Sequence, residues 1–223
     1  READGAEDSD DDANGYKDDL HGWDFVNQTA RIGDWNGHGT HVAGIVGAVN
    51  NNGRCVCGVA GGTGNGDGVR LMGCQIFTGG TSSNTSSSAI AFVYAADNGA
   101  CIAQCSYGNS FAITDDETYI NGGKMNHEGK EIDVDGSPLE NAALRYFLDP
   151  ANSNHESLEG NIAVFAAGNH NTPYSSYPGA LPYVISVTAF GADYLPGGYT
   201  NYGPGCKIAA PGGEYSDEHN YGM

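Results

Sequence analysis

Basic side chains are scarce in this chain of 223 residues. Lysine and arginine together number 9 against 28 aspartates and glutamates, which gives a formal net charge of −19. A surface of that sign repels nucleic acids and anionic lipids, so we expect no nucleic-acid partner. It also favours solubility, and it can hold calcium where carboxylates and carbonyls converge. Most of the acidic residues are explained more simply as a solvated face.

Long hydrophobic runs are also missing. No apolar stretch reaches the length of a membrane-spanning helix, and the chain does not open on the basic and apolar segments of a secretory signal. The length favours one domain with a substantial core. The 35 glycines show no collagen-like period and indicate turns in a loop-rich fold. We expect a monomer.

The cysteine spacing of common zinc sites is absent. Six cysteines allow 15 pairings, but Cys55 and Cys57 are too close together for a C-x-x-C knuckle. Cys74, Cys101 and Cys105 lie in apolar, strand-like segments, where free thiols behave as small hydrophobic groups. We therefore expect mostly free cysteines, and these do not define a redox compartment.

Strand and helix patterns alternate along residues 20–223. Residues 1–19, with an acidic run at 8–12, are expected to form an exposed loop or frayed end. Helical spacing marks the segments 38–49, 88–98 and, after a capping box at Ser137, 138–148. Buried strands are expected at 69–77, 101–106, 162–166, 183–187 and 207–210. This alternation predicts an α/β fold with three layers: a doubly wound, mostly parallel sheet with helices on both faces.

One histidine stands between two glycines in the segment 36–46, at the start of a helix of small apolar residues. Further blocks follow it in order: Gly58-Val59-Ala60-Gly61, Gln75-Ile76-Phe77, Cys105-Ser106-Tyr107-Gly108, Val164–Asn169, Tyr177-Pro178-Gly179, Val184–Val187 and Ala209–Gly212. Together they resemble the subtilisin-like serine proteases (subtilases, peptidase family S8). A single block carries little weight, whereas several in family order are specific. The resemblance implies a subtilisin-like fold.

The resemblance gives catalytic roles to two residues. His38 is the general base of a Ser-His-Asp triad, and its glycine neighbours leave the ring uncrowded. Asn169 supplies a side-chain amide to the oxyanion hole, where a neutral donor stabilises the charge that develops on the attacked carbonyl. Taken alone, the pattern would favour a histidine that caps a helix or binds solvent for His38, and an ordinary turn residue after Gly168 for Asn169.

Substrate contacts are implied for two further segments. An extended peptide would add as an extra strand along Ser106, Tyr107 and Gly108, so that its backbone is recognised. Ala167 and Gly168 would form part of a pocket wall. Tyr107 stands where the family often has an aliphatic residue, and a core aromatic at a strand end is an equal alternative for it.

The resemblance also exposes a gap, because the aspartate and the serine of the triad are not recognisable. Asp24 lies in a block that resembles a segment between the aspartate and the histidine, so we interpret it as structural or as part of a calcium site. Ser216 lacks the glycine and the helix pattern of a nucleophile. We expect a catalytic domain truncated at both ends, inactive as given, with both residues outside residues 1–223.

Calcium is the only cofactor that the resemblance suggests, in a structural role. The segment Val49–Gly53 is similar to a family loop that wraps calcium, with Asn51 as a side-chain ligand and Val49 as a carbonyl ligand. A plain Asn-Gly turn is the alternative. The polar insertion at about 109–136 could cover the cleft or form a surface excursion.

Three functional hypotheses remain. The first is a secreted or cell-surface serine endopeptidase domain that binds polypeptides. The second is a non-catalytic subtilase-fold binding module that retains the cleft. The third is a metal enzyme using His38 and His41, whose helical spacing can share one face, although no third ligand block accompanies them.

Overall fold

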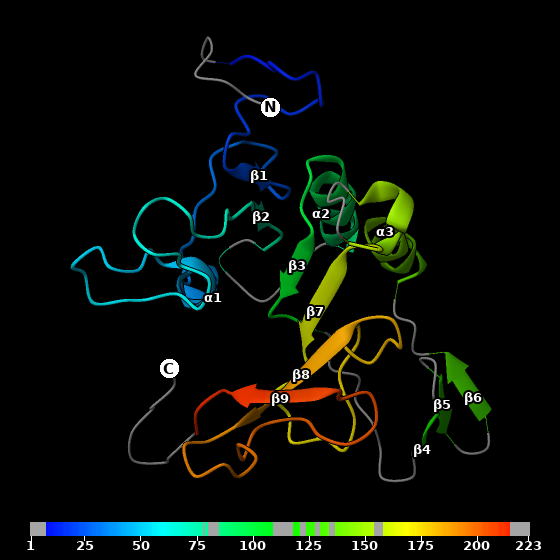
Figure 1. Cartoon of the computed structure of the whole chain (residues 1–223). Helices are drawn as coiled ribbons and strands as arrows, with labels where there is room; N and C mark the ends of the chain where they lie inside the picture. Colours follow the sequence, from blue (N-terminus) through cyan, green and yellow to red (C-terminus); the bar gives the residue numbers. More distant parts are fainter. Residues whose placement is uncertain are drawn as a thin grey trace. The chain divides into compact units, whose positions relative to one another are not determined.

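The computed structural model describes residues 8–77, 79, 85–108, 118–120, 124–127, 130–133, 137–153 and 158–214 (Figure 1). The chain divides into two compact units, residues 1–100 and 101–223. Each has its own strands and helices. Among the described residues, no helix is both long and apolar enough to cross a bilayer.

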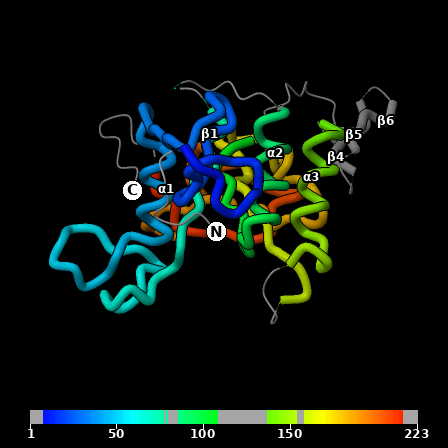
Figure 2. The backbone as a smooth tube through the Cα atoms, turned by 90° about the horizontal axis from the view of Figure 1, so that it is seen from above, coloured from blue at the N-terminus to red at the C-terminus, as the bar shows by residue number. Residues whose placement is uncertain are grey.

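The first unit contains a two-stranded parallel sheet and two helices. Strand β1 (Gly22–Asp24) pairs with β2 (Gly73–Gln75), and Gly22 lies opposite Gly73. A Cβ on Gly22 would overlap the Gly73 carbonyl oxygen, so these strands need glycine at this point. The helices are α1 (His38–Gly47) and α2 (Thr85–Asp97). The loop after α1, cyan in Figure 2, extends away from the helix before the chain returns to β2.

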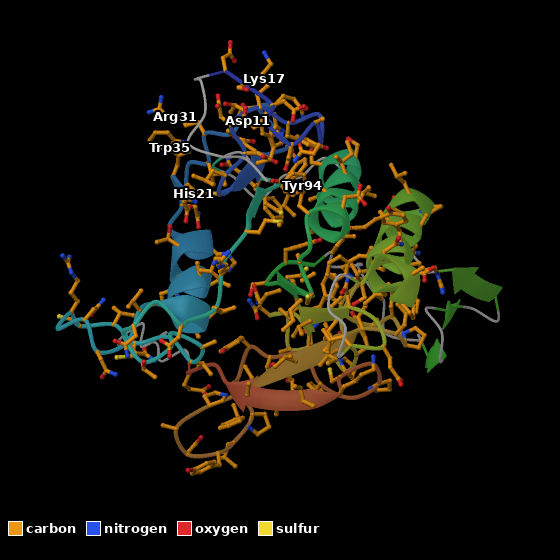
Figure 3. The ribbon with its side chains drawn as sticks, turned by 45° about the horizontal axis from the view of Figure 1, so that its top comes forward. Asp11, Lys17, His21, Arg31, Trp35 and Tyr94 are labelled. Carbon is orange, nitrogen blue, oxygen red and sulfur yellow. The ribbon has the colours of Figure 1, made fainter. Side chains whose placement is uncertain are left out.

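An aromatic cluster forms the core of this unit. Tyr16 contacts Trp23 and Tyr94 edge-to-face, with ring centroids 5.1 and 4.8 Å apart. Tyr94, labelled in Figure 3, donates from its hydroxyl to a carboxylate oxygen of the buried Asp19 at 2.6 Å. These contacts attach the end of the acidic segment 8–19 to β1 and α2, through the packing of Tyr16 and the hydrogen bond to Asp19.

The second unit is built on a four-stranded parallel sheet. Its order is β3 (Ile102–Cys105), β7 (Ile162–Ala166), β8 (Ile185–Phe190) and β9 (Ile208–Pro211), as Figure 1 shows. Helix α3 (Pro138–Leu148) buries Leu144 and Phe147 completely and is followed by a 3₁₀ turn, Pro150–Asn152. The Ser137 hydroxyl accepts the Glu140 amide at the start of α3, which confirms the predicted cap.

A separate antiparallel sheet lies within the insertion. Its strands are β4 (Thr118–Ile120), β5 (Lys124–His127) and β6 (Lys130–Asp133), in that order. The remainder of 109–136 lies outside the described residues, so the choice between a cover over the cleft and a surface excursion stays open.

Several predicted boundaries are wrong. The strand expected at 69–77 is reduced to β2, because its partner β1 offers only three residues for pairing. The strand expected at 183–187 begins at Ile185 and continues to Phe190, because pairing with β9 extends through Phe190. The helix expected at 38–49 ends at Gly47, and the helix expected from Ser88 begins at Thr85.

All six cysteines carry free thiols in this structure. Cys55 and Cys57 are exposed on the loop after α1, whereas Cys105 is buried in β3. Burial raises the pKa of the Cys74 thiol to about 12, so this thiol stays protonated at neutral pH.

Candidate active site

The turn before α1 is held by one carboxylate. Asp34 Oδ1 accepts the backbone amides of Asn36 and Gly37, at 3.2 and 2.8 Å. Its Oδ2 accepts both the amide and the hydroxyl of Thr40, each at 2.7 Å. The N-cap residue Gly37, at φ +85°, has no side chain to cap the helix, and Asp34 instead accepts the Thr40 amide in the first turn of α1. His38, the first residue of α1, lies between Gly37 and Thr40, which both hydrogen-bond Asp34.

The same bonds favour the ionised form of Asp34. The Thr40 hydroxyl, then the backbone amides of Thr40 and Gly37, lower the pKa of this carboxyl to about 2. A lowered pKa gives stability that is present above the unfolded value, near 3.9, and is lost as pH falls towards 2.

We expect Asp34→Asn to loosen the first turn of α1. The amide keeps one acceptor oxygen, which can still accept from Asn36 and Gly37, but its NH2 group cannot accept from Thr40, so the protection of the Thr40 amide against exchange should fall at pH 6. Below pH 3 the wild-type turn should loosen as well. NMR hydrogen exchange measures both. Asp67→Asn is the control, because Asp67 accepts the amide and hydroxyl of Thr63 in a turn away from α1; equal losses at Thr40 in both variants would contradict the assignment.

His38 itself is exposed, and no described group hydrogen-bonds its ring. Asp24 does not serve as its partner within the described structure. The Asp24 carboxylate is 2% exposed, and it accepts the amides of Val26 and Asn27 and the side-chain amide of Asn27. It closes the turn after β1, in keeping with a structural role. Within the described residues no metal-binding group of three His, Cys, Asp or Glu side chains forms around His41 or elsewhere.

The predicted oxyanion segment follows β7 and requires glycine. Gly168 has φ +117°, and a Cβ there would overlap both Asn201 Nδ2 and Ser176 Oγ. The preceding Ala167 is 1% exposed and bonds through its amide to the Val187 carbonyl. Asn169 comes next and is exposed, and no described group hydrogen-bonds its side chain.

The predicted substrate strand leaves the same end of the sheet. Strands β3 and β7 are parallel neighbours with Cys105 opposite Phe165, so residues 106–108 and 166–169 continue side by side from one edge. Gly108 closely approaches Tyr177, since a Cβ on it would lie 3.0 Å from the Tyr177 carbonyl oxygen. The structure thus brings these two predicted segments together within the second unit.

Tyr107 is turned towards the interior. Its ring packs edge-to-face on Phe165 at 5.7 Å, and its hydroxyl lies 3.4 Å from the Glu140 carboxylate, to which it donates. Burial raises the pKa of Tyr107 well above the usual range. These contacts favour the core alternative for its side chain, while its backbone remains at the strand end.

The predicted calcium loop supplies neutral oxygens only. Asn51 is in the left-handed conformation and donates from its side chain to the Thr63 carbonyl at 2.9 Å. Its neighbour Asn50 donates to the Gly62 carbonyl, which leaves its Oδ1 buried without a partner. An orphaned carbonyl oxygen suits a hard cation, but the described part of this loop adds no carboxylate. Asn50 therefore fits the ion better than Asn51 does.

Sequence reasoning missed Asp34 and Asn201. Asp34 stands four positions before His38 and has the residue type of a capping side chain, so its location offered a signal. Asn201 is 1% exposed and hydrogen-bonds the segment around Asn169. No local pattern marks it, because its partners lie about 30 positions earlier in the chain.

The parallel sheet and these segments define a subtilisin-like α/β protein. The chain belongs to the subtilase family, since the family model described as "Subtilase family" matches residues 4–223. Thermitase of Thermoactinomyces vulgaris is 27% identical over 191 residues, which cover 86% of this chain and 54% of thermitase. A thermophilic serine proteinase of Bacillus sp. (strain AK1) is 29% identical over 193 residues, 86% of this chain and 38% of that protein.

A solved structure shows the same fold. A cold-adapted subtilisin-like serine proteinase superposes with a TM-score of 0.59 at 24% identity, covering 86% of this chain and 54% of that one. The predicted α/β fold class is thereby confirmed. The chain spans about half the length of thermitase and less of the Bacillus enzyme.

Proposed function

We propose that this chain is the histidine-bearing and oxyanion-bearing part of an extracellular serine endopeptidase. One observation carries the proposal most strongly: Gly168 has no room for a side chain, and the exposed Asn169 side chain after it hydrogen-bonds no described group, just beyond the end of β7 and beside the continuation of β3. Preorganised, unpaired donors at such a point are what acyl transfer requires. The turn held by Asp34 supports the same interpretation for His38.

The proposed reaction uses a serine and an aspartate from outside residues 1–223. The serine oxygen attacks the peptide carbonyl while His38 takes its proton, and His38 then returns that proton to the leaving amine. Asn169 donates to the oxyanion of the tetrahedral intermediate. Water hydrolyses the resulting acyl-enzyme in a second cycle of the same proton transfers.

The peptide substrate would lie along residues 106–108 as an added strand. Backbone groups of Ser106 and Gly108 would pair with it, while the interior position of Tyr107 keeps its ring out of the strand's path. Ala167 and Gly168 would border the side chain before the scissile bond. Because the strand contributes backbone groups, recognition there would be largely independent of substrate sequence.

An extracellular location is proposed from the relatives, one of which is the cell wall-associated protease of Bacillus subtilis. We also propose that calcium binds at residues 49–53, with Asn50 as a neutral ligand beside Val49 and Asn51, and with further oxygens supplied from elsewhere. Its role would be to stabilise the loop after α1, and the reaction needs no cofactor.

The test uses the longest natural gene product that contains this chain. We expect it to cleave a fluorogenic peptide and to react covalently with a serine-directed phosphonate. Failure of both reactions in a folded protein that holds a serine and an aspartate in the family positions would contradict the proposal. Peptide binding without cleavage would instead favour a non-catalytic binding module.

Removal of the Asn169 amide should slow the reaction specifically. In Asn169→Ala we expect kcat to fall by about 10²–10³ with little change in KM, because the lost bond forms only in the transition state. Steady-state kinetics on a peptide anilide measures the two constants separately. Asn171→Ala, two positions away, should keep kcat within a few-fold; equal loss in the two variants would count against a specific oxyanion role.

A further inference from the structure

The side chain of Asn201 uses its full hydrogen-bonding capacity inside the second unit. Its Nδ2 donates to the Ala167 carbonyl at 3.0 Å and to Ser176 Oγ at 3.1 Å. Its Oδ1 accepts the amides of His170 and Thr172, at 2.9 and 3.4 Å. A carboxamide has two donor hydrogens and two acceptor lone pairs, so no capacity is left over. The residue is 1% exposed, which excludes water as a substitute partner.

These bonds enclose Asn169 on both sides. The backbone amide of Asn201 donates to the carbonyl of Gly168 at 3.0 Å, and its Oδ1 accepts the amide of His170. The residue directly before Asn169 and the residue directly after it are therefore both attached to Asn201. Asn169 itself is left exposed, with no described partner for its side chain.

Close packing adds a second constraint. The side-chain nitrogen of Asn201, Nδ2, occupies the space that a Cβ on Gly168 would need. The two residues can therefore approach only because Gly168 has no side chain. Asn201 is itself held by β8, since the Thr188 hydroxyl donates to the backbone carbonyl oxygen of Asn201 at 2.6 Å. Strand β8 thus fixes Asn201, and Asn201 fixes the segment 167–172.

We propose that Asn201 is the positioning residue of the oxyanion site, acting through Asn169 without touching the substrate. The inference rests on the proposed function and adds to it the residue that preorganises the donor. Oxyanion donors are effective only when they are aligned before reaction, and a displacement of about 1 Å can cost 10²-fold in rate. Only a carboxamide combines the two donors and two acceptors that this position needs. An aspartate there would set its charge against the Ala167 carbonyl.

The test compares Asn201→Ser with Asn201→Asp in the same gene product. Asn201→Ser introduces no charge into the buried site, so it is less disruptive than Asn201→Asp and is expected to fold. We expect kcat to fall about 10²-fold with KM nearly unchanged. Hydrogen exchange at the His170 and Thr172 amides should accelerate about tenfold, since each loses a bond. An Asn201→Asp variant with wild-type kcat would overturn the proposal.

A double-mutant cycle separates positioning from general stability. If Asn201 acts through Asn169, Asn201→Ser should lower kcat less than about threefold further in an Asn169→Ala background. Additive losses would overturn the proposal. The matched control is Asn161→Ala, a buried asparagine of the same unit whose Nδ2 donates to the Phe147 carbonyl. It should lower stability and leave kcat unchanged.

The hydrogen-exchange result also separates the positioning role from the proposed function. A wild-type protein without peptidase activity would contradict the proposed function. Faster exchange at His170 and Thr172 in Asn201→Ser would still support the positioning of the segment. An active wild type whose kcat and exchange are unaffected by Asn201→Ser would contradict the positioning alone.

Discussion

Replacement of His38 by alanine is expected to lower kcat about 10⁶-fold in the complete protein, the size of loss that follows removal of the histidine from a Ser-His-Asp triad. The serine hydroxyl is a poor nucleophile unless a base takes its proton, and the leaving amine departs only when it is protonated. One imidazole performs both transfers in the proposed reaction. KM should change little, since the ring contributes little to ground-state binding.

Stopped assays with a peptide anilide measure this loss, and phosphonate labelling should slow in parallel. His41→Gln is the matched control, because His41 lies on the same helix and its side chain makes no hydrogen bond to a described group. A His38→Ala variant that keeps more than about one hundredth of wild-type kcat would show that another base operates. Equal losses in the two variants would indicate a scaffold role for α1 instead.

Gly168→Ala is expected to lower the free energy of unfolding of the second unit by about 3–5 kcal/mol. The alanine methyl would overlap two buried polar atoms, Asn201 Nδ2 and Ser176 Oγ, and at least one of them must move. Displacement of Asn201 would break bonds to Ala167 and His170 and leave buried groups unpaired. The positive φ of Gly168 adds backbone strain for any residue with a Cβ.

Urea denaturation checks the size of this effect, and the midpoint should fall without a change in slope. Gly66→Ala isolates the strain, because Gly66 has φ +76° and no heavy atom lies within 4 Å of the place that an alanine methyl would occupy. We expect that control to cost about 1–2 kcal/mol. A Gly168→Ala variant no less stable than Gly66→Ala would show that the contact with Asn201 relaxes freely.

Elements with strong local signals were predictable from the sequence. The cap at Ser137 with proline after it fixed the start of α3, and the apolar run 162–166 coincides with β7. Strand β2 was overestimated because a strand's length depends on its partner, which lies about 50 positions away. The sequence of one strand does not show how many residues of a partner so far along the chain will pair with it.

The candidate site likewise contains residues with a local sequence signal and one residue that depends on long-range contacts. His38, Gly168 and Asn169 are predicted from their local blocks, because the glycines and small residues around them are required by the local backbone geometry. Asn201 is not found in this way. Its proposed role rests on bonds to Ala167 and His170, residues about 30 positions earlier in the chain. An asparagine between a threonine and a tyrosine is otherwise an ordinary loop residue.

The parallel pairing in the second unit also bears on the order in which the chain assembles. Strands β8 and β9 join Val187 to Ile208, about 20 positions apart, whereas β3 and β7 join Ile102 to Ile162, about 60 apart. Closing the longer loop costs about 1 kcal/mol more in chain entropy. The β7–β8 pair joins Val164 to Ile185 over a similarly short separation, so β7–β8 and β8–β9 are both favoured over β3–β7 as the earlier nucleus. The proposed substrate-binding segment, which follows β3, would be completed only after the remainder of the sheet had formed.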